Sequence, residues 1–487
     1  MSGHGDEVAA LAATAAQVVE RAGVALPGAE VHVAADRHRV GLTRFAESII
    51  HQNVAEDVAT VTLRAHLDGR TLESTATVAG DADLSSLVER VAAMVRDAPL
   101  DPGWPGLAPP ADAPRAVAPD EATVGATPHD RAEVVRAFVE AAGGLETAGY
   151  CRTTSWSGVT ANSAGQASDH RVATAELGGI ARLHGADGVA RHAPHRLGDL
   201  DGAALGARAA AKARAWQDPV DLEPQRMAVV LEPCAVADLV MSIGAVGCSG
   251  EALNLGTSFV RLGERQLDES LTFVDEPLET GLRHDHDGTP RRDLVVIDAG
   301  RSVAVAHDRR SAAEAGGGAT STGHAGDDRF GRGPSLRHLG IRPSGAPGES
   351  SGTRSVGAPP AAPAAEPAAE HEGPMADASV AALVAGVERG LLVSELWYTR
   401  LLEPRTVALT GLTRNGVWLI EGGEITRAVR NLRFTQSYVE ALSPGRVRGV
   451  GTSASPVPGD TYAATAPRWS CPALALEAWN FTGGSAG

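Results

Sequence analysis

The sequence predicts an α+β fold of two domains: an N-terminal mixed α/β domain with a largely antiparallel sheet over residues 1–220, and a β-rich, barrel-like C-terminal domain over residues 221–487. Three observations support this prediction. The chain has 487 residues, about three times the usual ~150 of one domain. Helical and alternating apolar patterns follow one another through its first half. Beyond the prolines at positions 219 and 224, strand-rich segments with glycine turns fill most of the sequence.

Two helices enclose a group of strands at the beginning of the chain. Apolar residues recur at helical spacing from Val8 to Val19. Alternating apolar runs follow, and the longest leads into Asp68-Gly69, a dipeptide that is typical of a tight hairpin turn. The predicted elements are a helix ending at Gly23, strands around 31–33, 40–42 and 58–67, and a helix over 83–97.

A long loop, a helix and a β-meander complete the predicted N-terminal domain. Eight prolines fall between positions 99 and 128, and this density predicts a surface loop. Two later turns are expected at Asn162–Gly165 and at Asp187-Gly188. The elements are a loop over 99–128, a helix over 129–148, a strand over 150–161, a second run through Ala181, and a helix over 203–216.

The C-terminal domain is expected to begin with a buried strand and a helix. An apolar run over 227–233 predicts the strand, and the helix follows over 234–244. The stretch 342–375 contains almost no large apolar residues, so it predicts a disordered insertion. The pattern then resumes with a helix over 378–390, a strand over 391–396, and paired strands over 417–420 and 425–429 around Gly422-Gly423.

The composition argues against partners that carry negative charge. The net charge is −17, which would repel nucleic acid and anionic membrane surfaces. The four cysteines lie far apart and form no CxxC pair, so they predict neither a zinc ribbon nor a disulfide framework. The N-terminal stretch lacks the basic start and apolar core of a signal peptide, and no run approaches 18 apolar residues. We therefore expect a soluble, cytoplasmic protein with no nucleic-acid and no membrane partner.

Sites for a metal or a nucleotide find little support in the sequence. The one His-Glu pair, at 371–372, lies in the predicted insertion and has no partner histidine one turn on. The densest group of potential ligands runs from His284 to Gly288, but alternate residues of a strand face opposite sides, so its members could share a face only in pairs. The Asp-Gly at its end favours a polar turn. Lys212 is the only lysine, which excludes a phosphate-binding GxxxxGK[ST] loop.

A covalent nucleophile is equally hard to identify. The segment Gly247 to Gly250 lacks the spacing of a GxSxG elbow. Cys248 lies in the same segment and could be a reactive thiol. A lone cysteine among small residues is more often a small buried hydrophobic residue, and this is the interpretation that we favour.

Six stretches of the C-terminal half, in order along the chain, resemble the TldD/TldE (PmbA) peptidase family, and its TldE/PmbA side in particular. The likeness extends more weakly to 44–53 and 162–165, so it covers most of the chain outside the insertion. The six stretches are VVLEP at 229–233, the segment 244–259, DHDGTPRR at 285–292, STGHAG at 321–326, GLLVSEL at 390–396 and GVWLIEGGEITRAV at 416–429.

The resemblance implies a subunit of a cytoplasmic, heterodimeric zinc metallopeptidase that cleaves unfolded or modified peptides. The TldD side of the family carries the zinc on an HExxxH helix, with a cysteine as a third ligand. The corresponding helix here, Val240 to Gly247, has neither histidine nor glutamate, and Cys471 lies in a Trp-Ser-Cys-Pro context unlike that ligand. We therefore expect no catalytic residue, metal ligand or cofactor in this chain, and we expect the zinc in a TldD-like partner.

Candidate substrate contacts are expected at two glycine-containing turns. They are Asp287 and Gly288 in the first turn, and Gly323, His324 and Gly326 in the second. Glycine lets a backbone approach a ligand closely, and His324 could donate a hydrogen bond to a substrate carbonyl, although a histidine in such a turn is more often a solvent-exposed loop residue. In this interpretation the chain shapes a groove that holds extended peptides by main-chain pairing to a strand edge.

Two other functions stay open at this stage. The chain could be an independent hydrolase that uses His324, or the pair His284 and His286, as a base or as unusual metal ligands. It could instead be a DNA gyrase modulator, as one name of the family suggests. The net charge of −17 speaks against direct contact with DNA, but not against a protein partner.

Overall fold

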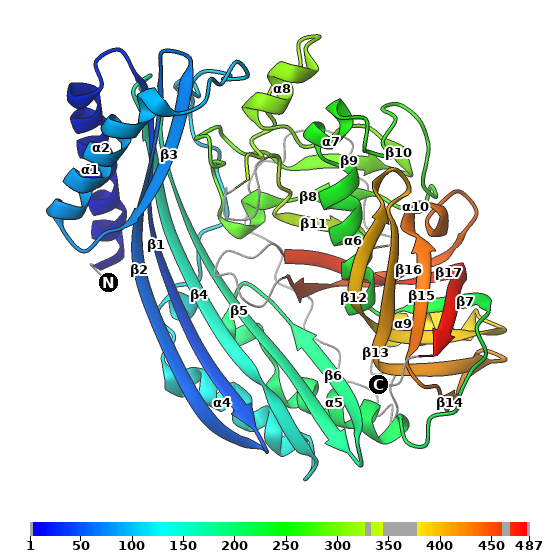
Figure 1. Ribbon diagram of the computed structural model, residues 1–487. Coiled ribbons are helices and arrows are strands. Elements are labelled where there is room, and N and C mark those ends of the chain that lie inside the picture. Colours follow the sequence, from blue (N-terminus) through cyan, green and yellow to red (C-terminus); the bar gives the residue numbers. More distant parts are fainter. Residues whose placement is uncertain (1–2, 327–332, 344–376, 460–467, 485–487) are drawn as a thin grey trace.

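The α+β class is confirmed by the computed structural model, which describes residues 3–326, 333–343, 377–459 and 468–484. Two sheets form the framework, one from residues up to His192 and one that begins at Arg226 (Figure 1). The domain boundary near residue 220 stays a prediction, and it falls between these sheets. The predicted insertion at 342–375 lies outside the described residues, apart from its first two positions.

Long antiparallel strands form the N-terminal sheet, in the order β3-β2-β1-β4-β5-β6. Along β1, Val31, Val33 and Ala35 are buried in a core beneath the helices. Because side chains alternate along a strand, His32 and the other even-numbered residues of β1 face the C-terminal half. The strands are β1 Glu30–Ala46, β2 Ile49–Leu67, β3 Arg70–Thr77, β4 Glu146–Asn162, β5 Ala167–Leu183 and β6 Ala186–His192.

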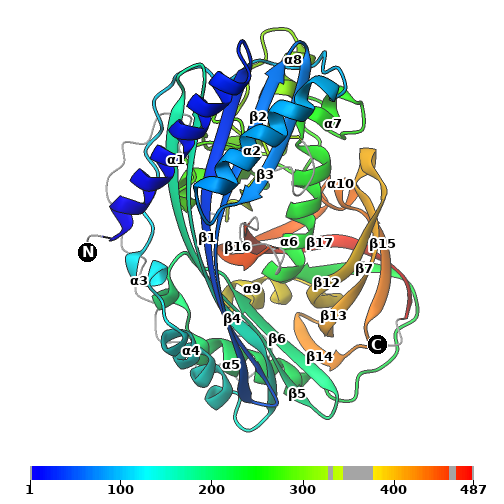
Figure 2. The ribbon, with the colours of Figure 1, turned by 60° about the vertical axis from the view of Figure 1, so that its left-hand side comes forward.

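Two pairs of helices cover the outer face of this sheet. The first pair crosses the end of the sheet near β3 and the second pair lies at the opposite end (Figure 2). The first pair is α1 Gly3–Ala25 and α2 Asp81–Met94, continued by the 3₁₀ turn η1 Val95–Asp97; the second is α4 Pro128–Ala141 and α5 Gly202–Ala215. Short helical turns precede α4 and α5, namely α3 Glu121–Val124 and η2 Leu197–Asp199.

Helix α1 contains, among the described residues, the one stretch that is long and apolar enough to cross a membrane by length and composition, Glu7–Ala25. In the structure this helix lies against β1 and β4. Its residues Ala15, Val18 and Ala22 are fully buried in the core beneath it.

Several predicted elements are confirmed and others need correction. The hairpin turn at Asp68-Gly69 joins β2 to β3, with both residues at positive φ (51° and 74°). The helix predicted over 129–148 ends at Ala141, because the next glycines adopt φ of 64° and 82° and the chain re-enters the sheet at Glu146. The turn predicted at Asp187-Gly188 lies instead at His184-Gly185, and Asp187 and Gly188 belong to β6.

A closed barrel of five strands is the centre of the C-terminal half. The strands follow one another around the barrel as β7, β12, β13, β15 and β17, and β17 pairs with β7 to close it. Glycines 422 and 423 make the predicted hairpin turn between β13 and β14 at φ of 60° and 79°. The barrel strands are β7 Arg226–Leu231, β12 Arg389–Glu403, β13 Ala408–Glu421, β15 Leu432–Ser437 and β17 Arg468–Gly484.

Further strands and short helices surround the barrel, with β8 and β11 on the side of the N-terminal sheet and β14 on the far side (Figure 1). The strands are β8 Phe273–Asp275, β9 Leu294–Asp298, β10 Arg301–Ser302, β11 His338–Ile341, β14 Glu424–Ala428 and β16 Val447–Pro458. The helical segments are α6 Pro233–Ser242, the π-helical turn η3 Ile243–Gly247, α7 Gly250–Asn254, η4 Pro277–Thr280, α8 Arg309–Ala315, α9 Ala378–Ala385, η6 Pro404–Thr406 and α10 Tyr438–Ala441.

Candidate functional site

A polar cavity lies where the inner face of the N-terminal sheet meets the loops of the C-terminal half. Its volume is about 110 Å³. The wall on the sheet side comes from β1, β2 and β3, and the opposite wall comes from the turn at Asp287, the loop at Ala325 and Gly326, and the beginning of α8. The loop Trp104 to Ala108 closes the third side.

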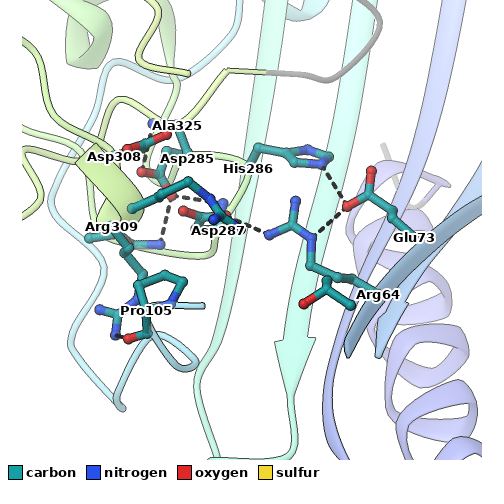
Figure 3. Close-up of polar contacts among 12 residues, drawn as sticks. Arg64, Glu73, Pro105, Asp285, His286, Asp287, Asp308, Arg309 and Ala325 are labelled. Atoms are coloured by element: carbon teal, nitrogen blue, oxygen red, sulfur yellow. Dashed lines mark hydrogen bonds and ion pairs between the residues drawn. The ribbon is translucent and has the colours of Figure 1, made fainter. Parts of the chain in front are cut away.

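Arg64 of β2 links the two halves of the molecule at the inner end of this cavity. Its Nε donates to Glu73 Oε2 at 2.6 Å and its Nη1 donates to Asp287 Oδ1 at 2.6 Å (Figure 3). His286 Nε2 lies 3.6 Å from the same Glu73 oxygen. Burial alone would lower the pKa of Arg64, but the two carboxylates raise it, so the guanidinium stays charged.

The turn that carries Asp287 is held by the neighbouring carboxylate of Asp285. Oδ1 of Asp285 accepts from the main-chain N–H groups of Asp287 at 3.0 Å and Thr289 at 2.9 Å, and Oδ2 accepts from Ala325 N at 2.9 Å (Figure 3). The polar turn predicted for this segment is therefore present. Burial and the nearby charge of Asp287 raise the pKa of Asp285.

The structure brings the two predicted turns together beside the cavity. Asp287 and Gly326 line it. Gly288, the residue after Asp287, has a φ of 76°. A Cβ atom at this position would come within 2.9 Å of Thr160 Oγ1. Gly323 packs against the Pro290 carbonyl, where a Cβ atom would come to 2.2 Å. Asp287 and Gly326 are thus the predicted contacts that reach the cavity, while Gly288 and Gly323 fix the paths of their turns.

His324 is inside the protein, so the alternative of a solvent-exposed loop histidine does not hold, and its role as a substrate contact stays a prediction. It is fully buried. Its Nδ1 lies 2.9 Å from Thr322 Oγ1, and its Nε2 lies 3.1 Å from Asp275 Oδ2. The second Asp275 oxygen accepts from His338 N at 2.7 Å. Both ring nitrogens of His324 are therefore engaged within the chain.

His284 and His286 do not converge on a common site. The ring of His284 faces His170, with Nε2 2.9 Å from His170 Nδ1, whereas His286 faces Glu73. Burial lowers the pKa of His284 to about 4. Among the described residues, no group of three or more His, Cys, Asp and Glu side chains is arranged to hold a metal ion.

The outer end of the cavity was not anticipated from the sequence. Arg310 of α8 forms a two-bond ion pair with Asp101, at 2.9 Å for each bond, and Arg309 donates to the carbonyls of Pro105 and Gly106 at 3.2 Å. These bonds make the proline-rich loop a fixed wall instead of a free surface loop. The hydrogen bonds of Arg310 lower the pKa of Asp101 to about 2. The prolines of this loop did not predict its contacts with α8, because prolines favour a turn but do not indicate which segment the turn packs against.

The inner wall residues could have been found from one signal in the sequence. His32 and Arg64 are polar residues in strands that otherwise carry apolar residues at alternate positions. Polar residues at such positions indicate the face of the sheet that does not pack against the helices. Sequence alone did not indicate which segment covers that face.

The region where the resembling family carries zinc has no room for a metal here. Val240 and Ile243 are fully buried. A Cβ atom at Gly244 would meet Leu339 at 2.7 Å, and one at Gly247 would meet Phe259 at 2.1 Å. Apolar side chains therefore fill this segment, which offers no imidazole or carboxylate, so its donor set does not fit zinc.

The four cysteines, all within the described residues, form no disulfide bond. All four are free thiols. Cys248 is fully buried, and burial raises its pKa to about 12, as the interpretation of a small hydrophobic residue requires. Burial also raises the pKa of Cys471.

Comparison with known proteins identifies relatives of the whole architecture. The family described as "PmbA/TldA metallopeptidase C-terminal domain" matches residues 224–483, more than half of the chain. A crystal structure of TldE from Thermococcus kodakarensis is similar with a TM-score of 0.78 at 18% identity, over 96% of this chain and 100% of that one. A search of curated protein sequences finds no match.

Two further solved structures share the fold. One is a proposed modulator of a DNA gyrase from Thermotoga maritima, with a TM-score of 0.75 at 15% identity over 96% of this chain and 100% of that one. The other is a proposed modulator of DNA gyrase from Bacteroides thetaiotaomicron, with a TM-score of 0.74 at 17% identity over 99% and 100%. At sequence identities of 15% to 18%, the similarity to these solved structures shows that the fold is shared.

Proposed function

The chain belongs to the PmbA/TldD family of metallopeptidases, and from this premise we propose that it is a TldE-like, non-catalytic subunit of a heterodimeric zinc peptidase. A TldD-like partner would carry the zinc and the catalytic groups. This chain would complete the substrate site and bind unfolded or modified peptides. Since all four cysteines are free thiols, a reducing compartment such as the cytoplasm suits it.

The observation that carries the proposal is the chemistry of the segment Val240 to Gly247. A peptidase zinc site needs imidazole, carboxylate or thiolate donors, and this segment supplies none. The segment keeps a π-helical turn, Ile243–Gly247, an irregularity that is frequent at functional sites. We infer that it retains the shape of a metal-bearing helix without its ligands.

Strand β3 supports the peptide-binding part of the proposal. It is an edge strand of the N-terminal sheet whose first residue, Arg70, pairs with Leu100, and its residues Thr71 and Glu73 line the cavity. An extended peptide could add to such an edge through main-chain hydrogen bonds, which accept many sequences. The peptide would then pass directly beside the polar cavity.

The two alternatives receive less support. His324, His284 and His286 are engaged with Asp275, His170 and Glu73, so an independent hydrolase would have to break those contacts first. A role as gyrase modulator rests on the names of two relatives at 15% and 17% identity. Recovery of gyrase subunits in place of a peptidase subunit from a native extract would favour that role.

Reconstitution with a TldD-like chain from the same genome tests the proposal. We expect cleavage of an unfolded peptide when both chains are present and none with either alone, and replacement of the partner's HExxxH glutamate by glutamine should abolish it. After chelation and zinc reconstitution, this chain alone should bind no stoichiometric zinc. One tightly held zinc per chain, or full cleavage without a partner, would contradict the proposal.

A further inference from the structure

The cavity carries an excess of negative charge. Of the residues that the structure describes, five carboxylates and three guanidinium groups line it. Arg64 is shared between Glu73 and Asp287, and Arg310 is paired with Asp101 outside the lining. Arg309 donates to main-chain carbonyls. The lining carboxylates that form no ion pair with any described residue are those of Glu251, Asp308 and Glu314.

These three carboxylates lie close enough to affect one another. Asp308 caps α8, with its Oδ1 accepting from Ser311 N at 2.7 Å. Burial, followed by the charges of Asp308 and Glu314, raises the pKa of Glu251, and the nearby charge of Arg310 offsets part of this rise. A cation bound among them would relieve this repulsion, whereas an anion would increase it.

A buried histidine supplies a second, independent feature. His32 lines the same cavity and is only 2% exposed, and its Nε2 has no hydrogen-bond partner among the described residues. Burial lowers its pKa to about 3, so the imidazole is neutral at pH 7. A neutral imidazole has one nitrogen that accepts a hydrogen bond, and such a group can accept from an ammonium N–H.

We propose that this cavity binds the α-ammonium group at the amino terminus of a peptide, with Glu251, Asp308 and Glu314 supplying the charge and His32 a hydrogen-bond acceptor. The inference rests on the proposed function, because a peptide held on β3 beyond the pair of Arg70 with Leu100 would place its end beside Glu73, which lines the cavity. A volume of about 110 Å³ holds a group of a few heavy atoms, since one water needs about 10–15 Å³ on the same measure. The subunit would thereby select for free peptide ends.

Binding of three peptides to the full chain, measured by calorimetry at pH 7, tests the inference. The probes are a decapeptide of Ala, Gly and Ser with a free amino terminus, the same peptide acetylated, and the acetylated peptide with one central lysine. We expect the free peptide to bind about tenfold more tightly than either acetylated one, since a charge-assisted hydrogen bond is lost on acetylation.

The double variant Glu251→Gln/Glu314→Gln should reduce that preference to about twofold or less. Both side chains are exposed at the edge of the cavity, so the variant should fold. The control Glu264→Gln/Glu269→Gln removes the same charge from exposed surface pairs with Arg261 and Arg265, and it should keep the preference. His32→Phe, which keeps a ring but removes the acceptor, should also weaken binding of the free peptide.

Each contrary outcome has a distinct meaning. Equal binding of the free and acetylated peptides would overturn the inference and leave the proposed peptide-binding role in place. Equal binding of the free and the acetylated lysine peptide would overturn the assignment to the amino terminus. If no peptide binds, the proposed function and the inference both fail.

Discussion

The only lysine of the chain lies in a buried ionic cluster between the two halves of the molecule. Lys212 of α5 pairs with Glu232 at the beginning of α6, and it donates to Ser394 Oγ at 3.0 Å. Arg208 donates to the second Glu232 oxygen at 2.8 Å. Burial lowers the pKa of Lys212 more than the pairing raises it, because one carboxylate is shared between two cations. The same two cations hold the pKa of Glu232 at about 2 although burial opposes them.

Replacement of Glu232 by glutamine should destabilise the protein in a pH-dependent way. The folded-state pKa of Glu232 is lowered from 4.5 to about 2, so its charge contributes about 3 kcal/mol that is fully present above pH 4.5 and lost as the pH falls toward 2. The difference in unfolding free energy between wild type and Glu232→Gln, measured by urea unfolding, should shrink over that range. A difference that stays constant would contradict this assignment, and Glu440→Gln at the exposed Arg226 pair serves as control.

The candidate site shows at residue level what the sequence could and could not predict. Asp287 and Gly326 were predicted because a polar turn and a glycine loop have local signatures, and both line the cavity. His324 was predicted to donate a hydrogen bond to a substrate carbonyl, but the structure buries it against Asp275, about 50 positions away, and no local pattern reports that contact. Glu251 and Glu314 gave no signal in the sequence, since only the fold brings them to the cavity, where they form no ion pair with a described residue.

At the level of elements, two glycines allow α5 to pack closely against α4 and against the N-terminal sheet. A Cβ atom at Gly206 of α5 would come within 2.1 Å of the Phe138 carbonyl of α4, and one at Gly188 of β6 would come within 2.1 Å of the Ala209 carbonyl. The apolar pattern predicted α5 correctly over 203–216, but it did not predict this contact. Asp187-Gly188 was predicted to form a turn. In the structure both residues belong to β6, and the absence of a side chain at Gly188 lets α5 pack closely on this strand.

Two glycine-to-alanine substitutions in helices should therefore have opposite effects. Gly206→Ala should destabilise the protein by about 1–3 kcal/mol, because overpacking against a main-chain carbonyl outweighs the gain in helix propensity. Gly23→Ala in α1 meets nothing within 4 Å and should stabilise by up to about 1 kcal/mol. Thermal or urea unfolding of both variants checks the sign, and stabilisation by Gly206→Ala would show that the helices separate at little cost.

On the scale of the whole molecule, the two halves meet through a layer of buried histidines. Along the inner sheet face the ring of Trp156 stacks on His38, with centroids 5.2 Å apart, and meets His170 at 4.2 Å. His170 in turn contacts His284 from the C-terminal half at 4.5 Å.

The sequence predicted part of this arrangement. The alternating pattern indicated strands with one apolar and one polar face, but the polar composition of the inner face gave no sign that the C-terminal half would cover it. Long strands were also underestimated, since β1 and β2 continue through polar residues where apolar periodicity fades.

This buried layer should make the whole protein sensitive to mild acid. Burial lowers the pKa of His32 and His195 to about 3, that of His284 and His338 to about 4, and that of His170 well below its usual value. In the unfolded chain these five rings take up protons near pH 6.5, so unfolding binds protons between pH 6.5 and 4 and stability falls with pH. Asp285 and Asp293, whose pKa burial raises, are protonated in the folded state and offset part of this uptake.

We therefore expect a net uptake of about three protons on unfolding, which corresponds to a loss of about 4 kcal/mol of stability per pH unit between pH 6 and 5. Urea unfolding at several pH values measures this slope directly. The variant His284→Gln, which keeps a polar group beside His170 but cannot be protonated, should reduce the slope by about one proton while lowering stability at pH 7.5. His129→Gln on the exposed surface of α4 should leave the slope unchanged. A wild-type slope near zero over this range would mean that the layer opens to water and admits protons without unfolding, and the rigid contact between the halves would then be refuted.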